Sequence, residues 1–149
     1  MWESFDKLFN YIYKGDEIAT KLSKDLLTLV HTWDDLIDKD KPVEDNEINR
    51  AFIIAIFDLG SNPYFTEAIK ANFYNVYLRW NDANDIEADE KATDNQLAMA
   101  WMLRAGLYDL FVLIAGQLYG RQWAEEIGVL VRNYYGEPLE GFIEEVRNA

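Results

Sequence analysis

Residues 94–117, DNQLAMAWMLRAGLYDLFVLIAGQ, form the stretch that decides the fold, because apolar side chains cover most of the helix that they predict. Thr93 and Gln96 have capping-box spacing at its start. Arg104 and Asp109 interrupt the apolar run, and a membrane-spanning helix rarely carries two central charges. We therefore expect a central, buried helix of a soluble protein rather than a membrane span.

The segments on both sides of this stretch also carry apolar residues at helical spacing, and none shows strand-like alternation. Glycine and proline fall between these segments, where helices end and begin. The first expected helix ends at Gly15, and the second runs from about Asp16 to Asp38. The third ends at Gly60, and the fourth runs from Pro63 to near Glu90. After residues 94–117, one helix follows Gly120 and the last begins at Pro138. The predicted fold class is all-α: a single compact domain over residues 1–149, a bundle of about seven helices.

Each helix is expected to bury one stripe of side chains. In the helix over 16–38 this stripe includes Leu26, Trp33 and Ile37. In the helix that ends at Gly60 it includes Phe52, Ala55, Ile56 and Leu59. Both stripes assume about 100° of rotation per residue along an unbroken α-helix.

Composition excludes several functional classes. A length of 149 residues with 50% hydrophobic and 15% aromatic residues indicates one folded domain and excludes disorder. The absence of cysteine excludes disulfides, thiolate metal sites and a cysteine nucleophile, and the single His31 excludes a multi-histidine site. Fourteen basic and 27 acidic residues give a net charge of −13, which disfavours direct binding to nucleic acid. We expect a cytoplasmic protein, since the N-terminus lacks a basic region followed by an apolar run.

Two acidic segments resemble metal-binding motifs. Residues 34–38, DDLID, resemble the DDxxD motif of soluble isoprenoid synthases. Residues 81–89, NDANDIEAD, are similar to the NDxxDxxxD motif of membrane-embedded aromatic prenyltransferases, although they depart from the second motif of the soluble synthases at Asp85 and Asp89. The resemblance covers fourteen residues and implies Mg²⁺ that binds a prenyl diphosphate. The ligands that it implies are Asp34, Asp38, Asp82 and Asp85.

Helical phase gives a different interpretation of these carboxylates. It places Asp38, Asp82 and Asp85 opposite the core stripes of their helices, and Asp34 on a flank. Plain surface charge is therefore the preferred interpretation. A shared site of two helix ends stays open, since a helix in a layered bundle can bury two faces.

A rotation of about 100° per residue also places Arg104 in the middle of the apolar, inward face of its helix. A buried guanidinium needs a carboxylate partner, and Glu87 is the predicted one because it lies on the inward face of its own helix. Asn84 is expected to take a further hydrogen bond. The pair is interpreted as a structural contact that fixes helix register, with an anion-binding arginine as the alternative.

Three functions remain, and the sequence assigns no catalytic residue. The leading hypothesis is association with itself or with another protein, through aromatic-rich helical surfaces that include Tyr11, Tyr13 and Tyr135. The alternatives are a Mg²⁺-dependent protein that binds or processes diphosphates, and an acidic mimic of nucleic acid that inhibits a partner. One further resemblance, to small helical proteins encoded by tailed phages, rests on the order of Trp33-Asp34-Asp35, Asn62-Pro63, Trp80, Arg104 and Trp123.

Overall fold

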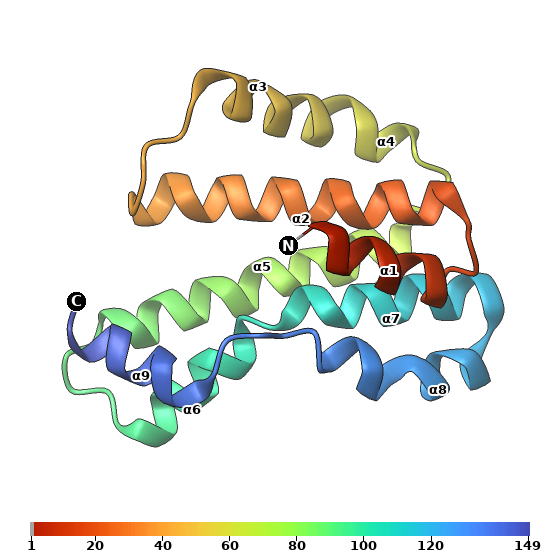
Figure 1. Cartoon of the computed structure of the whole chain (residues 1–149). Helices are drawn as coiled ribbons and strands as arrows, with labels where there is room; N and C mark the ends of the chain where they lie inside the picture. Colours follow the sequence, from red (N-terminus) through yellow and green to blue (C-terminus); the bar gives the residue numbers. More distant parts are fainter. Residues whose placement is uncertain (1) are drawn as a thin grey trace. The chain divides into compact units, whose positions relative to one another are not determined.

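The computed structural model describes residues 2–149, with side chains from Phe5 onward, and confirms the all-α class. The described residues contain no strand and form seven helices when residues 45–61 are counted as one helix and residues 94–119 as another. The elements are α1 (Trp2–Ile12), α2 (Glu17–Asp38), α3 (Asp45–Ile53), the π-helical turn η1 (Ile54–Asp58), α4 (Leu59–Ser61), α5 (Glu67–Ala88), α6 (Asp94–Leu103), α7 (Gly106–Tyr119), α8 (Arg121–Arg132) and α9 (Leu139–Arg147) (Figure 1).

Internal contacts divide the chain into two compact units, and the boundary falls near the start of α5. Unit 1 ends at Ala68, and unit 2 comprises Ile69–Ala149. The single domain predicted over residues 1–149 stays a prediction.

In unit 1, α1 and α3 each lie alongside α2 (Figure 1). The chain turns between α1 and α2 at Gly15, whose φ of +80° favours glycine. Asp16 then caps α2, since its side chain accepts hydrogen bonds from the backbone N–H groups of Ile18 and Ala19. Across the α1–α2 contact, the hydroxyls of Tyr13 and Ser23 lie 2.7 Å apart, with both residues fully buried.

Two predicted core stripes of unit 1 are partly wrong. Trp33 and Ile37 are 39% and 53% exposed, because the buried positions of α2 end at Thr32. Periodicity indicates the direction of a helix face but not how far the covering helices extend along it. Phe52 and Ile56 are exposed as well, because the helix turns Ala51 and Ile54 rather than these residues toward the core.

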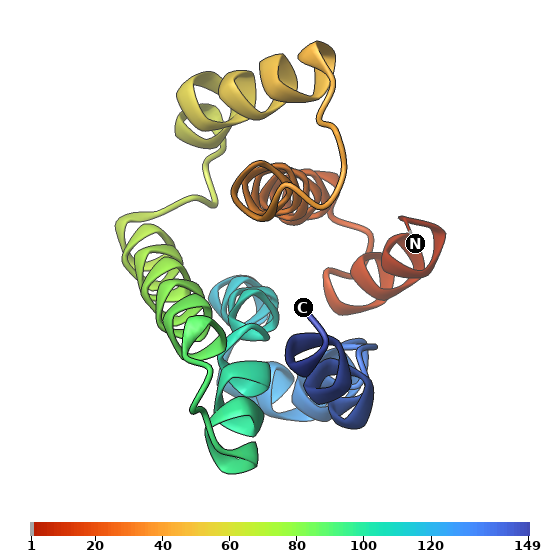
Figure 2. The same cartoon turned by 90° about the vertical axis from the view of Figure 1, so that its left-hand side faces the viewer.

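In unit 2, α7 lies between α5 and α8 (Figure 2). It buries a stripe of large side chains, and α8 contributes Ile127 and Val131 to the buried set. A second cluster joins α6, α9 and the end of α5. Its buried members are Ala83, Ala92, Leu97, Ala100 and Phe142.

The helix predicted over 94–117 is interrupted at Arg104 and Ala105, where α6 ends and α7 begins. At this point the Met102 carbonyl accepts hydrogen bonds from the backbone N–H of Ala105 at 3.1 Å and from Nη2 of Arg79 at 2.8 Å. Gly106 allows the close approach, because a Cβ there would lie 3.3 Å from the Arg79 Nε. The capping box of Thr93 and Gln96 is confirmed. The predicted start of the preceding helix at Pro63 is wrong, since α5 begins at Glu67.

Among the described residues, 94–119 is the one helical stretch that is long and apolar enough to cross a membrane by length and composition alone. Of its most apolar window, 39% is buried within the protein. A core helix of a soluble protein meets the same criterion, and the chain is compatible with a soluble protein.

Candidate functional site

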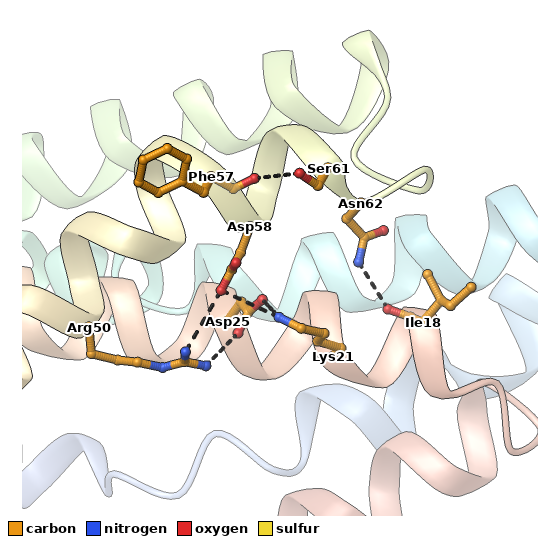
Figure 3. A network of polar contacts seen from close by, with 8 residues as sticks. All are labelled: Ile18, Lys21, Asp25, Arg50, Phe57, Asp58, Ser61 and Asn62. Carbon is orange, nitrogen blue, oxygen red and sulfur yellow. Dashed lines mark hydrogen bonds and ion pairs between the residues drawn. The ribbon is translucent and has the colours of Figure 1, made fainter.

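Four charged side chains connect α2 to the helix formed by α3 and η1 (Figure 3). Asp25 on α2 accepts a hydrogen bond from Nζ of Lys21 at 2.6 Å and lies 3.4 Å from Nη2 of Arg50. Asp58, the last residue of η1, lies 3.5 Å from Lys21 and 3.8 Å from Arg50. We call these four residues the α2–α3 ion network.

Asp25 explains why the network has this form. The residue is 4% exposed, and a buried carboxylate is stable only when it is paired. Two cations therefore approach it, one from its own helix and one from α3. The hydrogen bond with Asp25 is the main reason that the pKa of Lys21 is raised above its ordinary value, with smaller contributions from the charges of Asp25 and Asp58. The network links α3 and η1 to α2.

The π-helical turn η1 changes which residues of this helix face α2. In an unbroken α-helix Phe52 and Leu59 would share a face, since seven residues return to within about 20° of the start. The hydrogen bond from the Leu59 N–H to the Ile54 carbonyl spans five residues, so the turn contains one extra residue. That residue rotates Leu59 by about a quarter turn. Leu59 is consequently 5% exposed, while Phe52 is 60% exposed.

Four large apolar side chains lie together on the outward side of the helix, because positions 52, 53, 56 and 57 share one helix face. Phe52, Ile53, Ile56 and Phe57 are 60%, 45%, 62% and 62% exposed. The extra residue places Ile56 above Phe52 and Phe57 above Ile53. We call these four residues the α3 apolar face. Sequence periodicity assigned Phe52 and Ile56 to the core in one stripe with Leu59, and it contains no signal for the π-helical turn that separates Leu59 from Phe52.

Unit 1 also contains a cavity of ≈ 450 Å³ beside the ion network. Its charged lining residues are Lys21, Lys24, Arg50, Asp6, Glu17 and Asp25. These charges cancel, and both Lys24 and Lys21 are already in ion pairs with aspartates. The cavity therefore has no excess of positive charge that would select an anion.

In unit 2, the Arg104 guanidinium contacts the two partners that helical phase indicated. Its Nε donates to Oε2 of Glu87 at 2.6 Å, and its Nη2 donates to Oδ1 of Asn84. The side chains of Arg104 and Glu87 are 17% and 20% exposed, so the pair is partly rather than fully buried. It connects the end of α6 to the last turns of α5.

An aromatic cluster lies next to this pair. The ring of Tyr135 contacts those of Trp101 and Tyr108, and its hydroxyl donates to the Trp101 carbonyl at 2.8 Å. Burial, followed by the charge of Glu137, raises the pKa of Tyr135 to about 12. Of the tyrosines expected on an association surface, Tyr11 is 56% exposed, whereas Tyr13 is fully buried, and that part of the prediction is wrong.

The four predicted metal ligands lie on different units. Asp34 and Asp38 are on the last turns of α2, where Asp34 is half-buried and Asp38 exposed. Asp82 and Asp85 are exposed on α5. From residue 2 to residue 149, no group of three or more histidine, aspartate or glutamate side chains is placed to share a metal ion. Binding of Mg²⁺ stays a prediction.

Sequence reasoning missed one further charged group in unit 2. Asp109 on α7 receives hydrogen bonds from Arg79 on α5 and from Arg132 on α8, both at 2.5 Å. A single charge in a strongly apolar helix was the available signal, because such a residue needs partners from its neighbours. Comparison with family models, with curated proteins and with solved structures finds no match to this chain.

Proposed function

We propose that this protein acts by protein–protein association through the α3 apolar face. One observation supports the proposal above the others: the helix made by α3, η1 and α4 exposes more large apolar side chains than it buries. Its buried residues are Ala51, Ile54 and Leu59. Its four exposed apolar residues are larger in total and adjacent in space.

The extent of the face supports the same proposal. A phenyl side chain presents about 150–250 Å² when it is free, so Phe52 and Phe57 at 60% and 62% exposure each offer on the order of 100 Å². The four side chains together offer about 400 Å², which lies in the range of functional patches on monomeric proteins. π-Helical turns are also frequent at functional sites.

The class of partner follows from charge. A net charge of −13 favours a protein partner, or a second copy, over nucleic acid or an anionic membrane surface. We propose a cytoplasmic location, with which the partly buried helical stretch 94–119 is compatible. No enzymatic role is part of the proposal.

Site-specific photo-crosslinking tests the proposal in cells that produce the full chain. Benzoylphenylalanine placed at Phe52 or at Phe57 should give discrete protein adducts after irradiation. The control is the same residue at Val129 on α8, which is 73% exposed and lies in unit 2. If positions 52 and 57 give no more adduct than position 129, the proposed function is wrong.

A further inference from the structure

The chemistry around the α3 apolar face indicates what covers it. Resting on the proposed function, we infer that the occupant is an amphipathic helix of a different protein, with an apolar stripe that covers Phe52, Ile53, Ile56 and Phe57 and a cluster of lysine and arginine at one end. Three features of unit 1 support this: the shape of the face, its area and the charge at its N-terminal end.

The shape fits a helix. Phe52 to Phe57 span about 8 Å of helix axis, and the π-helical turn aligns the side chains in two adjacent rows. A ridge of side chains spaced three and four residues apart on a second helix packs against such rows at an axial separation of about 8–10 Å. Recognition of an amphipathic helix by an apolar surface uses this spacing.

The area argues against a second copy as the occupant. A stable interface buries about 800 Å² on each partner, roughly twice what the four side chains offer. Two copies of this chain would also bring together net charges of −13 each. That repulsion opposes a symmetric contact in which the same face meets itself.

The charge at one end of the face favours a basic partner. Residues 34–47 contain seven acidic residues and two lysines, a net charge of −5. They form the last turns of α2, the connection and the first turn of α3. Asp45 is exposed and lies two helical turns before Phe52, on the same side of the helix. A basic cluster that continues the apolar stripe of a bound helix would lie over this acidic end.

Binding of synthetic helical peptides to the full chain tests the inference. Three fluorescent peptides of about 18 residues are used. The first has an apolar stripe and a basic end, and the second has the same stripe and a glutamate-rich end. The third has the amino-acid composition of the first in scrambled order. We expect the basic-ended peptide to bind about tenfold more tightly than either control at about 50 mM NaCl. Its advantage over the acidic-ended peptide should shrink at about 500 mM NaCl, where screening is stronger.

Matched variants locate the binding. Phe52→Gln with Ile56→Gln should weaken binding of the basic-ended peptide about tenfold or more, while Val129→Gln should not. Asp40→Asn with Asp45→Asn should reduce the preference for the basic end about threefold. The control for that charge change is Glu144→Gln with Glu145→Gln on α9, which should leave the preference unchanged.

The outcomes separate this inference from the proposed function. The inference is overturned if the basic-ended peptide binds no more tightly than its scrambled form, or if binding survives the substitutions at Phe52 and Ile56. It is also overturned if sedimentation velocity shows a dimer of the chain that those substitutions dissociate, although the proposed function then stands. If the substitutions change neither peptide binding, nor self-association, nor crosslinking, both are wrong.

Discussion

Replacing Arg104 with alanine should lower the free energy of unfolding by about 2 kcal/mol. The guanidinium donates to Glu87 at 2.6 Å and also to Asn84, and a net hydrogen bond to a charged group contributes about 1.5–3 kcal/mol. The side chains of Arg104 and Glu87 are 17% and 20% exposed. Water can therefore hydrate the Glu87 carboxylate that the substitution leaves unpaired, which reduces the loss of stability. The estimate therefore lies below the cost of breaking a fully buried pair, about 3–5 kcal/mol.

A double-mutant cycle with Glu87→Gln isolates the pair itself. Urea unfolding followed by circular dichroism gives the four free energies, and we expect a coupling of about 1–2 kcal/mol. Arg121→Ala is the matched control, because Arg121 makes an ion pair with Glu125 in which the side chains are 89% and 62% exposed. That control should change stability by less than about 0.5 kcal/mol. An Arg104→Ala variant as stable as the Arg121→Ala variant would refute the reasoning.

Three further predictions test separate parts of the structure. Gly128→Ala in α8 should stabilise the protein by about 0.5–1 kcal/mol in thermal unfolding, since nothing lies within 4 Å of the added methyl group. Gly120→Ala should destabilise the protein, because φ is +92° at that position. Burial raises the pKa of Tyr13, so the folded protein holds the phenol proton more tightly than the unfolded chain does. The free energy of unfolding should therefore fall as pH rises above about 10, where the tyrosine of the unfolded chain ionises. Tyr13→Phe should make this alkaline loss of stability smaller in urea titrations at a series of pH values. Mg²⁺ with pyrophosphate should leave the melting temperature unchanged; a rise that Asp34→Asn with Asp82→Asn abolishes would instead support the diphosphate hypothesis.

Where the helices are regular, the sequence predicted a helix-capping contact and the inward face of two helices. The capping box of Thr93 and Gln96 involves neighbours in the sequence, so local spacing predicted it. The contact between Arg104 and Glu87 is not local, but both residues lie at or near the ends of regular helices, and a rotation of 100° per residue indicated their inward positions.

The α3 apolar face could not be predicted in the same way. A single extra residue in η1 moves Leu59 off the helix face that it was expected to share with Phe52, and no residue type marks a π-helical turn. The ion network was also missed. Asp25 lies among residues that were assigned by hydrophobic spacing alone, and its partner Arg50 is 25 positions away.

Urea unfolding of the Phe52→Gln, Ile56→Gln double variant tests most directly whether the α3 apolar face is a surface for a partner rather than part of the core. If the two side chains face solvent as described, the free energy of unfolding should stay within about 0.5 kcal/mol of the original protein. Leu59→Gln, on the buried side of the same helix, should lose about 3 kcal/mol. A loss in the double variant as large as that of Leu59→Gln would show that Phe52 and Ile56 belong to the core, and would contradict the account.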